Sequence, residues 1–358
     1  MCKDAGRVVR WVLCIGVLAG GLRLEGDERA SRSAVKEVAA AEGIVAAHRA
    51  LGRGVNLGNA LEAPREGDWG LVLASEFFEL IRKAGFSHVR VPTKWSAHAS
   101  QRPPYSIDPR FAERVDWVLD RAQAQGLRVV LNVHHYDELD NTPDEELPRA
   151  VAIWEQIATR YRNRGDWLYF ELMNEPHGRL NEEGRWNRTL PALLKAVRMS
   201  NRTRPVIVGP AWWNGIDALD EFQVPHDSNL IVTVHFYLPF PFTHQGASWV
   251  EGSDKWIGRR WGSPSDEREL AAIFAKAERW AQSHRRPIYL GEFGVYQQAD
   301  MGSRVRWTRA VVREAERRGW IWAYWEFGAG FGVYDREQHR WRTELLEALV
   351  GSPRPALR

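Results

Sequence analysis

The chain has almost no cysteine. Only Cys2 and Cys14 occur among its 358 residues, and both stand at the extreme N-terminus. The body of the protein therefore has no disulfide, no cysteine nucleophile and no cysteine ligand for zinc. Lysine is also scarce, with 7 lysines against 42 arginines, and the formal net charge is only +3. A charge this small, spread along the chain, argues against nucleic acid or an anionic membrane as a partner.

Long hydrophobic runs are missing as well. The apolar stretch at 11–22 holds about a dozen residues, whereas a membrane-spanning helix needs roughly 20. Lys3, Arg7 and Arg10 precede it, which is typical of a secretory signal. We expect residues 1–33 to be a signal peptide or disordered leader, and the protein to be secreted or periplasmic with no membrane contact after processing. An uncleaved anchor and a misassigned start codon are the alternatives.

The remaining chain alternates short apolar runs with amphipathic stretches, and it shows no composition break. We expect a lead-in helix at 34–51, one catalytic domain at 52–351 and a tail at 352–358. The apolar runs are uniformly hydrophobic, as parallel strands covered on both faces are. Eight such runs separated by helices predict an α/β fold, a single-domain (β/α)8 TIM barrel, with a doubly wound sheet as the competitor. The predicted strands are 54–57, 88–91, 128–133, 168–172, 206–208, 230–235, 287–290 and 321–325. The predicted helices are 75–84, 108–125, 149–162, 192–198, 267–283 and 304–318.

Almost every predicted strand ends in a polar or aromatic residue. In a TIM barrel these ends form one rim, where active sites lie. Glu175 follows the fourth strand and Glu292 the seventh, so barrel closure can bring them across one mouth. Hydrolysis of a glycosidic bond needs such a pair, one carboxylic acid and one carboxylate. The 18 tryptophans suit a groove that stacks the flat faces of sugars.

The histidines allow a metal site to be considered. His134, His135 and His235 could be combined with a glutamate into a zinc site. However, adjacent residues of a strand point to opposite faces, so His134 and His135 do not easily share one ion. No His-Glu-x-x-His spacing occurs in the chain. We therefore expect neither a metal nor another cofactor.

Six motifs in order along the chain resemble glycoside hydrolase family 5, in the retaining (β/α)8 clan A. They are Arg90–Pro92, Asn132–His135, Leu172–Pro176, His235–Tyr237, Gly291–Gly294 and Trp325. Segments 54–64 and 242–249 are similar to the endoglucanase branch of the family that also cleaves mannan. The resemblance runs from about Leu51 to Val350.

The resemblance implies a role for each matching residue. Glu175 would be the general acid/base and Glu292 the nucleophile. Five residues would support the pair: Arg90 and Tyr237 hold Glu292 ionised, Asn174 binds the 2-hydroxyl, and His134 and His235 complete the shell. Six more would contact sugar units: Asn59, Glu62, His135, His244, Trp249 and Trp325.

These observations predict a monomeric, retaining endo-β-1,4-glycanase. Its polysaccharide substrate would be β-1,4-glucan, as in cellulose or mixed-linkage β-glucan, with β-mannan or glucomannan as a further substrate. A carbohydrate-binding barrel without activity is the first alternative, although such a protein usually loses one of the two glutamates. A metal-dependent hydrolase is the second.

Overall fold

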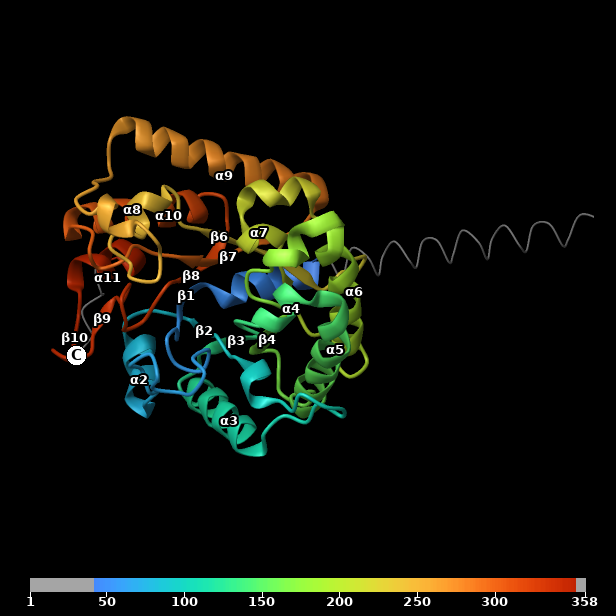
Figure 1. Ribbon diagram of the computed structural model, residues 1–358. Coiled ribbons are helices and arrows are strands. Elements are labelled where there is room, and N and C mark those ends of the chain that lie inside the picture. The colour runs from blue at the N-terminus through green and yellow to red at the C-terminus, as the bar shows by residue number, and fades with distance from the viewer. Residues whose placement is uncertain (1–41, 352–358) are drawn as a thin grey trace, which may run out of the picture. The chain divides into compact units, whose positions relative to one another are not determined.

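Eight parallel strands close into a barrel in chain order, and β8 pairs with β1 to complete it. The computed structural model describes residues 42–351. The strands form the centre of the view in Figure 1, and the helices surround them. The predicted (β/α)8 barrel is therefore confirmed. The strands are β1 (Arg53–Asn56), β2 (His88–Val91), β3 (Arg128–Asn132), β4 (Leu168–Glu171), β5 (Val206–Val208), β6 (Leu230–Phe236), β7 (Ile288–Phe293) and β8 (Ile321–Tyr324).

Helices connect successive strands and cover the outside of the barrel. The longer ones are α2 (Ser75–Lys83), α3 (Pro109–Ala124), α5 (Pro143–Arg160), α6 (Arg185–Arg198), α9 (Pro264–His284), α10 (Met301–Glu316) and α11 (Thr343–Val350). Short helices occupy the loops: η1 (Trp95–His98), α4 (Asp137–Asn141), η2 (Gly178–Gly184), α7 (Ala211–Asn214), η3 (Ile216–Glu221), α8 (Phe240–Thr243) and η4 (Ser253–Trp256). A small antiparallel hairpin, β9 (Tyr334–Asp335) with β10 (Arg340–Trp341), follows β8.

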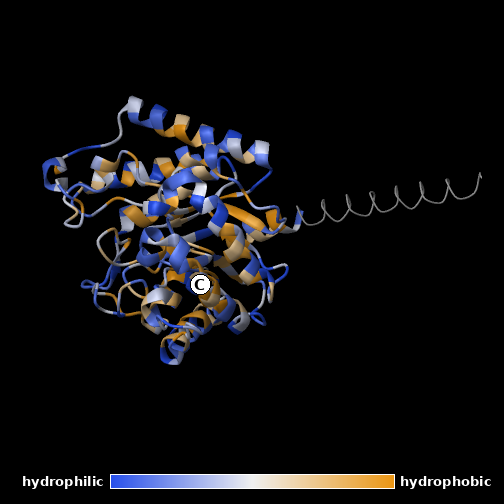
Figure 2. Ribbon diagram, turned by 45° about the vertical axis from the view of Figure 1, so that its right-hand side comes forward, coloured by the Kyte–Doolittle hydropathy of each residue, from blue (hydrophilic) through white to orange (hydrophobic). Residues whose placement is uncertain are grey.

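Two apolar cores stabilise the barrel. The larger lies between the strands and the helices, whose outer faces are hydrophilic in Figure 2. The smaller fills the barrel interior, where Tyr169 and Tyr289 pack with Ile44 and Leu51 from the helical residues before β1. This helix closes the end of the barrel at which the strands begin. The opposite end is left for polar side chains.

Two predicted helices begin too late. The predictions 149–162 and 192–198 each start directly after a proline, but α5 begins at Pro143 and α6 at Arg185. Pro148 and Pro191 lie inside these helices. A proline inside a helix removes one backbone hydrogen bond. Here the apolar face continues through it, and tertiary packing outweighs that loss, as Ile153 and Trp154 of α5 are buried.

The terminal predictions fall outside the described residues. The predicted signal or leader at 1–33 and the tail at 352–358 both do so. Of the lead-in segment, residues 42–51 are described and are helical. Within residues 42–351, no helix has the length and hydrophobicity needed to cross a membrane.

Candidate active site

A buried arginine organises the rim of the barrel. Arg90, the third residue of β2, has no exposed surface. Its Nε and Nη2 donate to the two carboxylate oxygens of Glu171 at 2.6 and 3.0 Å. Nη2 also donates to Asn174 Oδ1 at 2.7 Å, and Nη1 donates to Asn56 Oδ1 at 2.8 Å and to Glu292 Oε1 at 2.7 Å. One guanidinium thus binds side chains from β1, β4 and β7 and from the loop after β4.

Glu292 is held from two sides. It lies inside β7, which extends to Phe293 and so beyond the predicted end at Leu290. Arg90 binds one of its carboxylate oxygens, and the Tyr237 hydroxyl donates to the other at 2.9 Å. Both oxygens therefore accept a hydrogen bond from a donor fixed in the protein.

Glu175 and His235 form the facing pair. His235 Nδ1 lies 2.7 Å from Glu175 Oε1. A β-bulge between Val234 and His235 shifts the register of β6, so that His235 pairs with Glu292 of β7. Bulges commonly re-aim a side chain beside an active site. Gly291 leaves the room for this ring, since a Cβ there would lie 2.9 Å from His235 Nε2.

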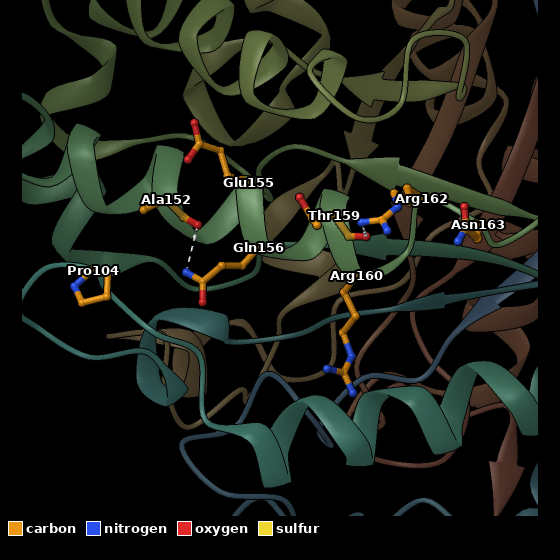
Figure 3. Close-up of a pocket in the computed structure, with 8 residues that line it drawn as sticks. All are labelled: Pro104, Ala152, Glu155, Gln156, Thr159, Arg160, Arg162 and Asn163. Atoms are coloured by element: carbon orange, nitrogen blue, oxygen red, sulfur yellow. Dashed lines mark hydrogen bonds between the residues drawn. The ribbon is translucent and has the colours of Figure 1, made fainter.

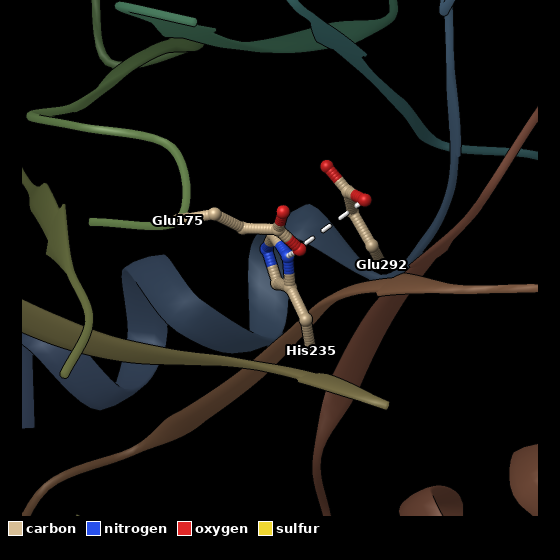
Figure 4. Close-up of side chains that lie close together, drawn as sticks. All are labelled: Glu175, His235 and Glu292. Carbon is tan, nitrogen blue, oxygen red and sulfur yellow. Dashed lines mark hydrogen bonds and ion pairs between the residues drawn. The ribbon is translucent and has the colours of Figure 1, made fainter. Parts of the chain in front are cut away.

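The two carboxyl groups face each other across a short gap. Figure 4 shows Glu175 and Glu292 pointing toward one another with the His235 ring beside them. One polar atom from each of the three side chains lies within 4.8 Å of the other two. A metal ion could fit this spacing. However, the Arg90 guanidinium already binds Glu292, and a second cation so close to it would be repelled.

Burial sets the protonation of these groups. Loss of solvent raises the pKa of Glu175 to about 7, and Arg90 opposes this rise. Burial also raises the pKa of Glu292, while His235, Arg90 and the Tyr237 hydroxyl lower it. For His235, burial lowers the pKa to about 4, so the imidazole is neutral near pH 7. Glu292 contacts the Arg90 guanidinium and accepts hydrogen bonds from both Arg90 and Tyr237, so its ionised form is the better stabilised of the two. When Glu175 and Glu292 share one proton, that proton therefore lies on Glu175.

Aromatic and imidazole rings line the side of the site near β3 and β8. His134 stacks on Trp325 at a centroid distance of 5.9 Å, and its Nδ1 lies 3.1 Å from Asn132 Nδ2. His135 meets His134 edge-on at 4.4 Å and Trp69 at 5.5 Å. The expectation that these two side chains point to opposite faces of a strand is wrong: β3 ends at Asn132, His135 has a left-handed φ of 48°, and the two rings are in contact. Trp325 is only partly buried.

The long segment after β6 adds a second wall. His244 stacks on Phe240 at 4.1 Å and meets Tyr237 edge-on at 5.1 Å. Trp249 is 60% exposed, and its ring packs edge-on against Tyr296 at 4.9 Å. The predicted residues His244 and Trp249 therefore belong to the same aromatic cluster as Tyr237, which donates to Glu292.

Glu62 does not present its carboxylate to the mouth of the barrel. Its side chain is fully buried, and it accepts hydrogen bonds from the backbone N–H groups of Asn59 and Ala60. Burial raises its pKa to about 8. Asn59 is half-buried and adopts a left-handed φ of 65°. Glu62 holds that turn in place.

Comparison with known proteins shows what this site belongs to. Residues 53–330 match the model of the cellulase family, glycosyl hydrolase family 5. The chain belongs to glycosyl hydrolase family 5.

The solved structures similar to this family 5 hydrolase cover nearly all of it. Cel5A of Thermotoga maritima, solved with mannotriose, is 52% identical with a TM-score of 0.84, and the alignment covers 86% of this chain and 99% of that one. The structure of the same protein with cellobiose is 53% identical with the same TM-score and coverage. Endoglucanase H of Acetivibrio thermocellus is 36% identical over 308 residues, which are 84% of this chain. The chain spans only about a third of that relative, 33% of its length.

Sequence reasoning missed several residues of the site. Glu171 holds Arg90, yet it lies within β4 and was not singled out from the sequence. Asn214, in the loop after β5, has an amide atom 3.4 Å from His235 Nε2. A polar residue buried inside an otherwise apolar strand, as Glu171 is, was the signal available for the first.

Glu326 explains the glycine-rich segment after β8. Its buried carboxylate accepts the backbone N–H groups of Gly328, Ala329 and Phe331 at 2.7 to 3.1 Å. The segment therefore wraps around a carboxylate of the protein itself. Because Trp325 is the preceding residue, the same hydrogen bonds anchor the loop that carries its indole.

A separate hollow lies on the outside of the barrel (Figure 3). It is lined mainly by the second half of α5, which runs toward the end of the barrel opposite the active site. Arg160 there is already paired with Asp116, and Gln156 with backbone groups. None of the predicted site residues lines it. The lining residues are Pro104, Ala152, Glu155, Gln156, Thr159, Arg160, Arg162 and Asn163.

The Glu326 anchor gives a stability prediction. Glu326→Gln replaces one accepting oxygen by an NH2 group, so at least one buried N–H loses its acceptor. We expect the free energy of unfolding to fall by about 1–3 kcal/mol, the usual cost of such a loss. Chemical denaturation measures it. Glu337→Gln, at an exposed position in the turn between β9 and β10, is the control, and equal stability of the two variants would contradict the anchor.

Proposed function

We propose that the protein is a retaining endo-β-1,4-glycanase in which Glu175 is the general acid/base and Glu292 the nucleophile. The spacing of these two groups carries the proposal. Carboxyl groups of retaining glycosidases lie about 5–5.5 Å apart, and those of inverting enzymes about 6.5–9.5 Å apart. An approach of Glu175 and Glu292 oxygens within 4.8 Å supports retention, since it leaves no room for a water between nucleophile and sugar.

The first step uses the asymmetry of the pair. The Glu292 carboxylate attacks the anomeric carbon and forms a glycosyl ester, while the Glu175 proton moves to the glycosidic oxygen as the C–O bond breaks. In the second step Glu175 takes a proton from water, whose oxygen displaces Glu292 from the same carbon. Asn174 is proposed to bind the sugar 2-hydroxyl through its Nδ2, because its Oδ1 already accepts a hydrogen bond from Arg90. Such contacts strengthen in an oxocarbenium-like transition state.

The substrate is proposed to be a β-1,4-glucan chain, with β-mannan or glucomannan as a further substrate. Aromatic rings lie beside residues of the site: Trp325 stacks on His134, and the exposed Trp213 stacks on His177, two residues after Glu175. Relatives named endoglucanase, and a solved relative in complex with mannotriose, support both chemistries. His134, His135, Asn59, His244 and Trp249 are proposed to contact further sugar units.

A substrate panel tests this choice. We expect release of short oligosaccharides from carboxymethyl cellulose, barley β-glucan and glucomannan, because both walls of the site offer ring-stacking surfaces. Product sizes from chromatography separate internal from terminal cleavage. Cleavage of xylan alone, or binding to all polysaccharides without cleavage, would contradict the proposal.

Paired azide-rescue experiments test the two roles. Glu292→Gly and Glu175→Ala should each lose at least about 10²-fold in activity on β-glucan. With dinitrophenyl β-cellobioside and azide, the Glu292 variant should form an α-glycosyl azide in one displacement. The Glu175 variant should instead form the β-azide, because its glycosyl-enzyme still forms. NMR of the products distinguishes them, and Glu251→Gln, an exposed glutamate of the β6–β7 segment, serves as control. The same azide anomer from both variants would refute the assignment.

The pH dependence follows from the Glu175 pKa. Glu175 must start protonated, and its pKa is about 7, so kcat/KM on β-glucan should fall tenfold per pH unit above about pH 7. A dinitrophenyl glycoside needs no proton on its leaving group. Its glycosylation rate should therefore lack this basic limb. If both substrates showed a basic limb at the same pH, the limb would belong to a group other than Glu175.

Export and a monomeric state belong to the proposal as well. The basic residues followed by an apolar run at 11–22 support a cleaved signal. N-terminal sequencing of protein recovered outside the cell would locate the cut, and an intact Met1 there would contradict it. Light scattering would test the monomer.

A further inference from the structure

Asn214 is buried beside the acid/base pair and takes part in no step described so far. It has no exposed surface, and it ends the short helix α7 in the loop after β5. The Asn214 amide satisfies its neighbours in one orientation only. Its nitrogen then donates to Pro210 O at 2.9 Å, and its oxygen accepts from the Glu175 backbone N–H at 3.3 Å. That same oxygen end lies 3.4 Å from His235 Nε2.

The backbone is strained to deliver this amide. Trp212, Trp213 and Asn214 follow one another with φ of 55°, 56° and 54°. A left-handed conformation costs most residues other than glycine about 1–2 kcal/mol, so three in succession need a compensating reason. Gly209 also makes room, because a Cβ there would collide with the Asn214 amide.

The hydrogen bonds around His235 admit only one proton arrangement. A neutral imidazole has one N–H and one bare nitrogen. A proton on Nδ1 would leave a bare Nε2 facing the Asn214 oxygen, which is a contact between two acceptors. A proton on Nε2 satisfies Asn214 and leaves Nδ1 bare, 2.7 Å from Glu175 Oε1. Nδ1 can then accept a hydrogen bond only from a protonated Glu175.

We propose that Asn214 is a positioning residue that holds His235 as its Nε2–H tautomer and thereby keeps the acid proton on Glu175. The proposal rests on the acid/base role assigned to Glu175. When that proton moves to the glycosidic oxygen, the Glu175 carboxylate faces the bare Nδ1. This contact disfavours the ionised form, so Glu175 remains a good base for the water of the second step.

Other charged and titratable groups surround Glu175 and His235, and they also affect the pKa of Glu175. Burial lowers the pKa of His235 to about 4, which keeps it neutral at working pH. The groups that face Glu175 or His235 come from several elements: Arg90 of β2, His134 after β3, Asp140 of α4, Glu171 of β4, His177 after β4, Tyr237 after β6 and Glu292 of β7. All of them are present in the Asn214 variant, so a change there reports Asn214 alone.

The tautomer can be observed directly in the unmodified protein. With ¹⁵N-labelled histidine, we expect His235 Nε2 to give a pyrrole-type signal and Nδ1 a pyridine-type signal at pH 6–7. The spectrum of His235→Gln assigns the signals by their loss. A protonated Nδ1 in the wild-type protein would overturn the proposal. This measurement needs no substrate, so it decides the tautomer even if the proposed hydrolase activity fails.

Kinetics test the consequence. Asn214→Gly removes the amide and tolerates the positive φ. His235 is then free to place its proton on Nδ1 and stabilise ionised Glu175. We expect the basic limb of kcat/KM on β-glucan to move about one pH unit lower, with a loss of about tenfold above it. The kcat/KM for dinitrophenyl β-cellobioside, which reports the glycosylation step alone, should be unchanged.

The matched control is Asn229→Gly, which removes a half-buried amide just before β6, at the other end of that strand. It should leave the limb in place. An Asn214→Gly variant with an unmoved limb and equal losses on both substrates would show a merely structural role and overturn the proposal. If neither substrate is cleaved by the wild-type protein, the proposed function fails, and the NMR result stands alone.

Discussion

The Arg90 guanidinium is the interaction on which the rest of the site depends. It is a cation without solvent, and it is stable only because two carboxylates and two amides surround it. Glu171 neutralises the charge with two parallel hydrogen bonds, a geometry that suits a guanidinium. Because Glu171 already neutralises the Arg90 charge, Nη1 binds Glu292 with a weaker electrostatic attraction than an unpaired arginine would exert. A buried charge pair of this kind adds little net stability, but it fixes where each group lies.

The same desolvation acts on both glutamates of the site. Both lose water, and for each of them burial alone favours the neutral form. The difference comes from their neighbours. Glu292 receives Arg90 and the Tyr237 hydroxyl, whereas Glu175 receives a neutral imidazole whose own tautomer depends on Asn214. One fold thus gives two identical side chains different environments, as acid–base enzymes do for their paired groups.

Other buried carboxylates position loops instead of reacting. Glu62 binds the turn at Asn59, Glu326 binds the loop after β8, and Asp140 accepts the backbone N–H of His177. Each replaces a missing backbone acceptor in a loop that carries a site residue. Their raised pKa values show that a perturbed carboxyl group alone does not identify a catalytic residue. Geometry relative to the opposite carboxylate does.

The sequence by itself determined the barrel, because each strand is a local apolar run and parallel strands bring their ends to one rim. It also identified Glu175, Glu292, Arg90 and Tyr237 as neighbours at that rim through their positions at or just after the ends of predicted strands. The predicted helix starts at Arg149 and Ala192, directly after Pro148 and Pro191, were wrong, since the packing that retains a proline in a helix is not local.

Only the tertiary structure decided which oxygen each donor binds and which carboxylates accept hydrogen bonds from loop backbone instead of facing the site. Arg90 and Glu292 are 202 residues apart, and His235 and Asn214 meet through a β-bulge and a strained loop that no periodicity reveals. Hydrogen bonds and desolvation depend on distances of a few tenths of an ångström between such distant segments. A pattern of residue types along the chain does not determine distances this finely. The folded structure does.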